Sequence, residues 1–518
     1  MSEQNTVEVE TAHGRISGLM EGGIARFLGI PYAAAPTGDL LFDAPAPPEP
    51  WTGVRTAHAF GPTAPKPPLG GQLGDIVSDP DIEGEEWLNL NVWTPDHRAS
   101  GLPVLVWIHG GGFTTGSSAV PTYDGAAFAR DGLVCVSINY RLGVYGYGYL
   151  PDAPAPANRG LLDQIAALRW VRENIARFGG DAGNVTVAGE SAGAMSVLAL
   201  LSRDDGLFHR AIAQSGTAHI GQTPEDATKV LKAVADKLGI EPTCRDLTDI
   251  SAEELLKAQN MVSADISQAP DAAKYGASTM AGCGMSFMPV VDGTTLPKRP
   301  IDAIADGAGA TIPLLMGTTA EEFRLFIVTT VLVAWNIPAL YNNHLNCYSV
   351  PTGSWNEYKK GGTGTYPRDA ACGVACALFT DRMFRIPTYR VAEARAATAG
   401  AAPTHLYELG WRSPVTPNKI GVSVGACHSV DLPFAWNTLD LPESLKFTGP
   451  NPPQPLADAL HGAWAAFAES GQVSWAAYDT AKRPVMTYAH DNTPTAHQVV
   501  EDPRRSERQW WDGHPATS

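Results

Sequence analysis

The sequence predicts an α/β fold built on a mostly parallel central sheet, and two patterns between residues 102 and 216 carry this prediction. Strand-like and helix-like segments alternate there, which is typical of crossover units that lay parallel strands side by side. Two of the strand-like segments, 103–108 (PVLVWI) and 133–140 (LVCVSINY), are nearly continuous apolar runs. Strands that are buried on both faces of a parallel sheet have this composition.

The other elements follow from the spacing of apolar residues along the chain. We expect, in order, a helix at 163–178, a strand at 184–188, a helix at 192–201, strands at 211–213, 313–317 and 404–409, a helix at 456–467 and a last strand at 485–488. The stretch from about 220 to 400 is more helical and irregular, so we expect insertions that decorate the sheet. No linker-like segment interrupts the chain, which predicts a single domain over 1–518.

Composition narrows the class of protein further. The chain has 518 residues, of which 44% are hydrophobic and 18% charged, as in ordinary globular proteins. Its net charge of −17 argues against a nucleic-acid partner, which requires a basic face. No apolar run reaches the ~20 residues of a membrane span, and residues 1–6 (MSEQNT) lack the features of a signal peptide. The seven cysteines are scattered, so we expect reduced thiols in the cytoplasm and no metal site.

Residues 187–194 (VAGESAGA) place Ser191 at the joint between a predicted strand and a predicted helix. Gly189 and Gly193 lie two residues to either side, which gives the G-x-S-x-G pattern of a nucleophile elbow. Such an elbow is a sharp turn that lifts a serine hydroxyl above the end of the sheet. Because a helix begins directly after it, the N–H of Ala192 is well placed to bind a developing oxyanion. The pattern predicts Ser191 as a nucleophile.

A glycine-rich segment, 109–113 (HGGGF), follows the strand at 103–108. Three consecutive glycines leave their backbone N–H groups unobstructed, as an oxyanion hole requires. The alternative is a flexible turn at the end of a strand. Its position, some eighty residues before an elbow serine, favours the oxyanion hole.

A serine nucleophile needs a base, and the base needs an acid that orients it. Among thirteen histidines, His428 in the small-residue loop GACHSVD suits a mobile imidazole at the mouth of a site, although spacing alone leaves His405 as an alternative. In this kind of fold the acid lies between serine and histidine in the chain. Glu321 and Glu322 both follow a predicted strand, and a capping box from Thr319 to Glu322 offers a structural role instead. The residues alone do not choose between the two glutamates.

Eight motifs occur in the order in which one known family has them. They are FLGIPYA (27–33), LNLNVWTP (88–95), WIHGGGF (107–113), NYRLG (139–143), GLLDQ (160–164), FGGDAGNVTVAGESAGA (178–194), QSG (214–216) and PVVDG (289–293). On these motifs the sequence resembles the bacterial type-B carboxylesterases, of the family that includes the cholinesterases, over nearly the whole chain. The resemblance implies an α/β-hydrolase fold with a Ser–Glu–His triad.

The resemblance also implies a role for each candidate residue. The family's G-T-x-x-D-E-G corresponds to 317–323, which makes Glu322 the acid, and the family's histidine corresponds to His428. The implied oxyanion donors are Gly111, Gly112 and Ala192, and the implied supports behind the triad are Glu190 and Ser215. Arg141 and Asp163 correspond to a structural ion pair of the family.

The resemblance places the acyl side of the substrate pocket near the segment before PVVDG. The pocket residues that we expect on this basis are Cys283, Met285 and Phe287, and ordinary core packing is an equal alternative for these three. Phe113, directly after the three glycines, is a further expected pocket residue. The stretch 75–86 carries six acidic residues and no basic one. It would favour cationic esters if it flanked the entrance, but we expect a solvated loop.

Three positions depart from the family pattern. Trp87 replaces the cysteine of an N-terminal disulfide, which fits a reducing compartment. Leu41 replaces the arginine that partners the glutamate corresponding to Glu85. Phe323 replaces the glycine after the acid and puts a bulky group close to the triad.

The predicted function is hydrolysis of carboxylic esters through an acyl-enzyme. Hydrolysis of carbamates or amides by the same residues is an alternative, and a non-catalytic relative is disfavoured because Ser191, Glu322 and His428 are all present. We expect a small-molecule ester as substrate, no cofactor, no metal and no nucleic-acid or membrane partner. Monomer and weak dimer both remain open.

Overall fold

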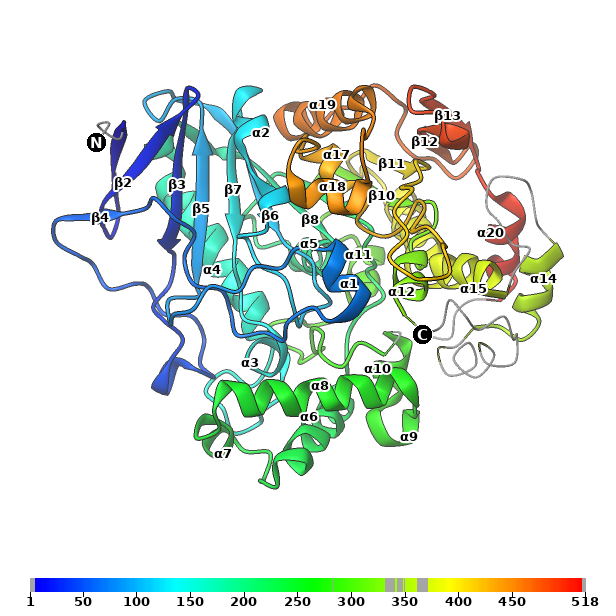
Figure 1. Ribbon diagram of the computed structural model, residues 1–518, viewed down its shortest axis with the longest axis horizontal. Coiled ribbons are helices and arrows are strands. Elements are labelled where there is room, and N and C mark those ends of the chain that lie inside the picture. Colours follow the sequence, from blue (N-terminus) through cyan, green and yellow to red (C-terminus); the bar gives the residue numbers. More distant parts are fainter. Residues whose placement is uncertain are drawn as a thin grey trace.

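The protein is described here by a computed structural model. The residues that the structure describes are 5–282, 284–330, 341, 348, 350–360 and 371–514. Their centre is a 13-stranded sheet in the order β1-β2-β3-β5-β7-β6-β8-β9-β10-β11-β12-β13, with β4 paired to β2 (Figure 1). The strands are β1 (Thr6–Thr11), β2 (Gly14–Glu21), β3 (Ile24–Pro31), β4 (Val54–Thr56), β5 (Asn89–Thr94), β6 (Leu102–Ile108), β7 (Val134–Ile138), β8 (Gly180–Glu190), β9 (Arg210–Gln214), β10 (Leu314–Thr319), β11 (Thr404–Leu409), β12 (Pro484–Tyr488) and β13 (Gln498–Glu501).

The sheet is parallel from β7 to β12, and antiparallel strands extend it at both edges. The parallel part contains the strands that the sequence predicts, so the expectation of a mostly parallel sheet is confirmed. The edge strands β1 to β5 were not predicted. They lie outside the segment 102–216, where alternating strand and helix patterns give the clearest signal, and they pair antiparallel with their neighbours, apart from β4, which pairs parallel with β2.

Helices connect and cover the strands. They are α1 (Gly71–Ile76), α2 (Ala126–Arg130), α3 (Gly143–Tyr147), α4 (Arg159–Asn174), α5 (Ala192–Arg203), α6 (Pro224–Leu238), α7 (Cys244–Thr248), α8 (Ala252–Gln268), α9 (Ala272–Tyr275), α10 (Ala277–Ala281), α11 (Pro300–Ala305), α12 (Arg324–Val328), α14 (Ser354–Lys360), α15 (Ala371–Thr380), α16 (Ile386–Ala397), α17 (Leu432–Ala435), α18 (Pro442–Thr448), α19 (Gln454–Ser470) and α20 (Arg505–Asp512). Helices α6 to α10 form a group at the bottom of the view in Figure 1. Membrane-spanning helices need about 20 apolar residues, and the described part of the chain contains no such helix.

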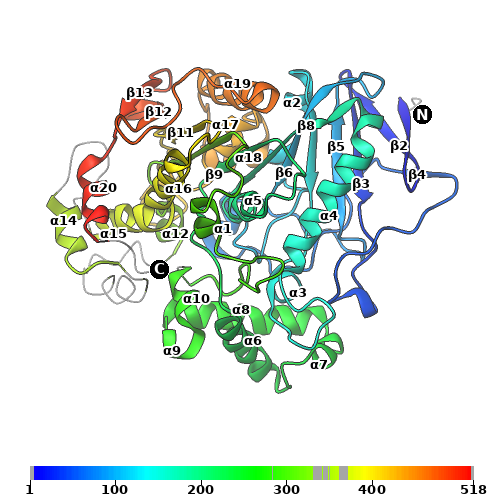
Figure 2. The same ribbon diagram turned by 180° about the vertical axis from the view of Figure 1, so that it is seen from behind.

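Two hydrophobic cores lie on opposite faces of the sheet, and β6 contributes to both. Val104, Val106 and Ile108 belong to the core with α4 and α5, whereas Leu105 and Trp107 belong to the core with α17 and α19. Figure 1 shows α17 and α19 over one face, and Figure 2 shows α4 and α5 over the other. Since successive side chains of a strand point to opposite faces, burial on both faces explains why the sequence of β6 is an apolar run.

Two features implied by the family resemblance are visible in the core. Arg141 and Asp163 form the expected ion pair, with both side chains fully buried and nitrogen–oxygen distances of 2.7 and 2.9 Å. Trp87, which stands where the family has a cysteine, is 6% exposed and lies 5.7 Å from the ring of Tyr145. Its indole N–H donates to the carbonyl of Gly84 at 2.7 Å. Trp87 is thus packed in the core, and the cysteines that the structure describes are free thiols.

Candidate active site

Four neighbouring strands, β6, β8, β9 and β10, end at the same edge of the sheet. Their register aligns Ile108 with Gly189, Glu190 with Gln214, and Gln214 with Gly317. Because the strands are parallel, the segments that leave their carboxyl ends come together, where open α/β sheets bind ligands. These segments carry, in strand order, 109–116, Ser191, Ser215 and Glu322.

Ser191 occupies a strained turn between β8 and α5. Its backbone angles are φ 56° and ψ −124°, outside the regions that L-residues favour. The turn is held by the N–H of Ser191, which donates to the carbonyl of Gln214 at 2.9 Å. The flanking glycines are required by space: a Cβ on Gly189 would lie 2.5 Å from the backbone of Gly193, and one on Gly193 would lie 2.0 Å from the carbonyl oxygen of Ile108. The structure therefore has the geometry of a nucleophile elbow.

Glu322 lies behind His428 and is hydrogen-bonded on both carboxylate oxygens. Oε2 is 2.6 Å from Nδ1 of His428, and Oε1 accepts the Ser215 hydroxyl and the N–H of Thr319, each at 2.6 Å. The side chains of Glu322 and His428 are 0% and 4% exposed. A buried carboxylate held in this way fixes the orientation of the imidazole through Nδ1.

The two alternatives left open by the residues have other surroundings. Glu321 accepts the N–H of Ala426 at 3.1 Å and forms an ion pair with Arg412 at 3.3 Å. Its carboxylate therefore binds neighbouring segments of the chain. His405 lies on β11, where its ring contacts Trp475 at 6.1 Å between ring centres and burial lowers its pKa. The structure thus brings Glu322, and not Glu321, to His428.

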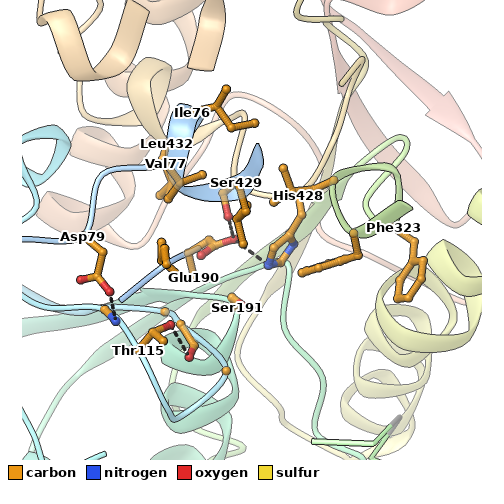
Figure 3. A pocket seen from close by; sticks show the side chains of 18 of the residues that line it. Ile76, Val77, Asp79, Thr115, Glu190, Ser191, Phe323, His428, Ser429 and Leu432 are labelled. Atoms are coloured by element: carbon orange, nitrogen blue, oxygen red, sulfur yellow. Dashed lines mark hydrogen bonds and ion pairs between the residues drawn. The ribbon is translucent and has the colours of Figure 1, made fainter. Parts of the chain in front are cut away.

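The second nitrogen of His428 faces the pocket next to Ser191. Nε2 lies 3.1 Å from Oε1 of Glu190, outside hydrogen-bonding geometry, and the same oxygen accepts the Ser429 hydroxyl at 2.6 Å (Figure 3). Ser191 and His428 line one cavity, although no hydrogen bond joins their side chains in the described part of the chain. Glu190 therefore stands beside Nε2 of His428, at the wall of the cavity that Ser191 also lines.

Burial and neighbouring charges shift the pKa values of His428 and Glu190. Burial by itself lowers the pKa of His428, but the carboxylates of Glu190 and Glu322 outweigh burial and raise it to about 9. Burial raises the pKa of Glu190 to about 7, against the opposing effect of the His428 charge. The carboxylates thus favour the imidazolium, the form in which a histidine cannot accept a proton.

Replacing Glu190 by glutamine is expected to move the acidic limb of the kcat/KM profile to lower pH by about one unit or more. The amide removes the negative charge beside Nε2, so the imidazolium is less stable and His428 loses its proton at lower pH. The profile with a short p-nitrophenyl ester measures this shift. Glu443→Gln is the control, because Glu443 lines the same cavity and, among the residues that the structure describes, forms no hydrogen bond or ion pair with His428. An acidic limb that is unchanged, or that moves to higher pH, contradicts the attribution of the raised His428 pKa to Glu190.

The glycine-rich segment after β6 is folded into a tight turn beside Ser191. The carbonyl of Gly111 accepts the N–H groups of Thr114 and Thr115 at 3.0 and 2.9 Å. Gly111 and Gly112 line the cavity, and Ala192 is the first residue of α5. Within the described residues, the N–H groups of Gly111, Gly112 and Ala192 have no hydrogen-bond acceptor. For Ala192 this is usual, because the first N–H groups of a helix have no partner within it.

The cavity has a volume of about 980 Å³ and a largely apolar lining rich in phenylalanine. The rings of Phe326 and Phe384 flank the imidazole of His428 at 5.4 and 4.9 Å between centres. Phe323, the residue that replaces the family's glycine, stacks on Phe379 at 4.6 Å. It lines the cavity without crowding His428, because its ring packs against α15.

The structure places the predicted pocket residues in different surroundings. Met285 lines the cavity, whereas Phe113 and Phe287 are not among its lining residues. Phe113 is fully buried against Tyr147, and Phe287 is 2% exposed in the core. Both phenylalanines belong to the hydrophobic core of the protein, since their side chains are buried among other apolar residues. Cys283 lies outside the described residues.

The acidic stretch 75–86 is mainly a solvated loop, as expected. Its exposed acidic residues are Asp75, Asp81, Glu83, Glu85 and Glu86. The exception is Asp79, which lines the cavity with a buried side chain. In the described part of the chain, no three His, Cys, Asp or Glu side chains converge as a metal site would require.

A strained elbow serine, a buried Glu–His pair and a glycine-rich turn at the carboxyl edge of a parallel sheet define the class: a hydrolase of the α/β-hydrolase fold. Comparisons with known proteins agree. The model of the carboxylesterase family matches residues 4–511. A para-nitrobenzyl esterase of Bacillus subtilis (strain 168) is 35% identical over 521 residues, which cover 97% of each chain. A phenmedipham hydrolase of Pseudarthrobacter oxydans is 34% identical over 478 residues, or 89% of each chain.

Solved structures give the same result. The crystal structure of a Geobacillus stearothermophilus carboxylesterase at pH 6.2 matches with a TM-score of 0.82 and 36% identity, covering 97% of this chain and 99% of that chain. The chain therefore belongs to the carboxylesterase family. It is a carboxylic ester hydrolase with the α/β-hydrolase fold that its motifs predict.

Proposed function

We propose that the protein hydrolyses esters through a covalent acyl-enzyme formed on Ser191. His428 acts as the general base, Glu322 orients it, and the N–H groups of Gly111, Gly112 and Ala192 bind the oxyanion. The observation that supports this most is the 2.6 Å contact of Glu322 with Nδ1 of His428, which leaves Nε2 facing the cavity that Ser191 lines. A hydroxyl needs such a base to become a nucleophile at neutral pH.

In the first half of the reaction the Ser191 oxygen attacks the ester carbonyl while Nε2 of His428 takes its proton. The carbonyl oxygen becomes an oxyanion, and the three amide groups stabilise it without reorganisation. His428 then donates the proton to the departing alcohol, which leaves the acyl group on Ser191. In the second half, water attacks the acyl group with the same base and the same oxyanion hole, and the carboxylic acid leaves.

The cavity supports esters with bulky apolar groups as the substrate class. Its volume of about 980 Å³ lies near the upper end of the ~300–1,000 Å³ range of ligand pockets. The aromatic rings of Phe326 and Phe384 flank His428, and they favour aryl and branched apolar groups through burial of apolar surface. The cavity is also lined by the acidic residues Glu190, Asp79 and Glu443. Glu190 and Asp79 already contact a cationic or hydroxyl partner.

A fluorophosphonate probe tests the proposed nucleophile. We expect one covalent adduct, which peptide mass mapping places on Ser191, with loss of ester hydrolysis in proportion to labelling. Matched aryl ester, carbamate and anilide substrates then separate the reaction types, and we expect turnover to be highest for the ester. An adduct outside residues 185–200, or faster turnover of the carbamate or anilide, contradicts the proposal.

A further inference from the structure

One wall of the cavity is formed by a segment that a buried ion pair holds in place. Leu73, Ile76 and Val77 of this segment line the cavity. The side chains of Lys66 and Asp79, at its two ends, are 2% and 4% exposed, and Nζ of Lys66 contacts Oδ1 of Asp79. Removing two charges from water is unfavourable, and only close pairing with further hydrogen bonds offsets it. The pair therefore needs a further partner.

That partner belongs to the glycine-rich turn beside Ser191. The other carboxylate oxygen of Asp79, Oδ2, accepts the N–H of Gly116 at 3.0 Å (Figure 3). Nζ of Lys66 donates in addition to the carbonyl of Pro80 at 2.6 Å. Each charge thus has a partner besides the other, and a hydrogen bond from a backbone N–H to a carboxylate is stronger than one between neutral groups.

Gly116 is the closing residue of the turn that carries the proposed oxyanion donors. Its φ is 92°, and a Cβ there would lie 2.4 Å from the carbonyl oxygen of Gly110, so the two ends of the turn are in contact. Between them, the carbonyl of Gly111 is tied to the N–H groups of Thr114 and Thr115. A shift of Gly116 would therefore be transmitted to the N–H groups of Gly111 and Gly112.

We propose that Asp79 is a positioning residue for the oxyanion hole, and that Lys66 holds its carboxylate in place. The inference rests on the proposed function, since it assigns Asp79 to the oxyanion hole of that mechanism. Asp79 acts through Gly116 and contacts no reacting atom. A displacement of about 1 Å at a catalytic group can cost ~100-fold in rate, so one hydrogen bond at the end of the turn affects kcat.

Two double variants of equal charge separate the hydrogen bond from the ion pair. Both replace Lys66 by methionine; Asp79→Asn keeps an oxygen that accepts the N–H of Gly116, whereas Asp79→Leu has none. Relative to K66M/D79N, we expect K66M/D79L to lose roughly ten- to a hundredfold in kcat with KM within about twofold. A trifluoromethyl ketone, which forms an oxyanion when a serine adds to it, is expected to bind more weakly by the same factor.

Asp502→Asn is the control for loss of a buried ion pair. Asp502 is paired with Arg508 at 2.7 Å, its side chain is 6% exposed, and it does not line the cavity. We expect this variant to lower Tm without changing kcat or the affinity for the ketone. A kcat for K66M/D79L within about twofold of that for K66M/D79N overturns the inference, as does a loss that lies in KM alone.

If K66M/D79L does not fold, the single variant Asp79→Glu tests the inference instead. It keeps the charge beside Lys66 but moves the carboxylate by one methylene, so kcat falls at constant KM if the inference is right and is unchanged if it is wrong. Fluorophosphonate labelling distinguishes a failure of this inference from a failure of the proposed function. An adduct on Ser191 in every folded variant leaves that function standing whatever the kinetics, and an adduct elsewhere in the unaltered protein overturns it.

Discussion

Replacing Ser191 by alanine is expected to lower kcat for short p-nitrophenyl esters by about a million-fold while the fold is retained. Without the hydroxyl no acyl-enzyme forms, and the oxyanion donors alone leave a small residual rate over water. The variant removes one oxygen atom from a half-buried position, and no hydrogen bond of that hydroxyl is found in the described part of the chain, so unfolding by heat or denaturant is expected to be nearly unchanged.

Initial rates of p-nitrophenol release measure this effect, with Tm and circular dichroism as checks of the fold. Ser202→Ala is the matched control, because Ser202 lies on the same helix, α5, and its hydroxyl donates only to the carbonyl of Ala199 at 2.7 Å. It is expected to hydrolyse the ester at the unaltered rate. Comparable turnover by Ser191→Ala would end the assignment of the nucleophile.

Replacing Gly193 by alanine is expected to have the second largest effect, on both activity and stability. The added Cβ would lie 2.0 Å from the carbonyl oxygen of Ile108, at the point where α5 crosses the end of β6. Backbone atoms must move to relieve this contact, and overpacking of this kind costs about 1–3 kcal/mol or more. Because Ser191 and Ala192 directly precede Gly193, the movement displaces the nucleophile and one oxyanion donor together.

We expect kcat to fall by roughly a hundredfold or more in this variant, with a lower Tm. Gly462→Ala is the control: Gly462 lies inside α19, and a Cβ there has no heavy atom within 4 Å. Alanine is the better helix former by about 1 kcal/mol, so this control is expected to be active and slightly more stable. A folded Gly193→Ala variant with unchanged kcat would show that the elbow tolerates a side chain.

The parts of the site that the sequence predicts are those with a local signal. The elbow is one turn of chain, and its serine and glycines lie within five residues, 189–193. Burial of both faces gives β6 and β7 their apolar runs. The assignment of Glu322 over Glu321 rests on the family resemblance alone. Both glutamates follow β10, and the difference between them is which one the backbone directs toward His428, 106 residues away.

Other contacts of the site have no signal in the sequence around their residues. Asp79 reads as one acidic residue among six in a solvated loop, and only the fold shows its buried contacts with Lys66 and Gly116. Phe326 and Phe384 flank His428 although they are far from it in the chain. Phe113 shows the opposite case: it adjoins the glycines that line the cavity, but its side chain points into the core.

By itself the sequence determined the class of fold, the strand-to-helix turn at Ser191 and the glycines that this turn requires, because each depends on spacing and bulk over a few residues. The tertiary structure decided which carboxylates surround His428, which aromatic side chains form the cavity wall, and how Asp79 reaches the glycine-rich turn. These are contacts between segments far apart in the chain. The distances between these groups, and the effects of their charges on one another, arise only when the sheet brings the carboxyl ends of its strands together. No pattern along one segment contains them.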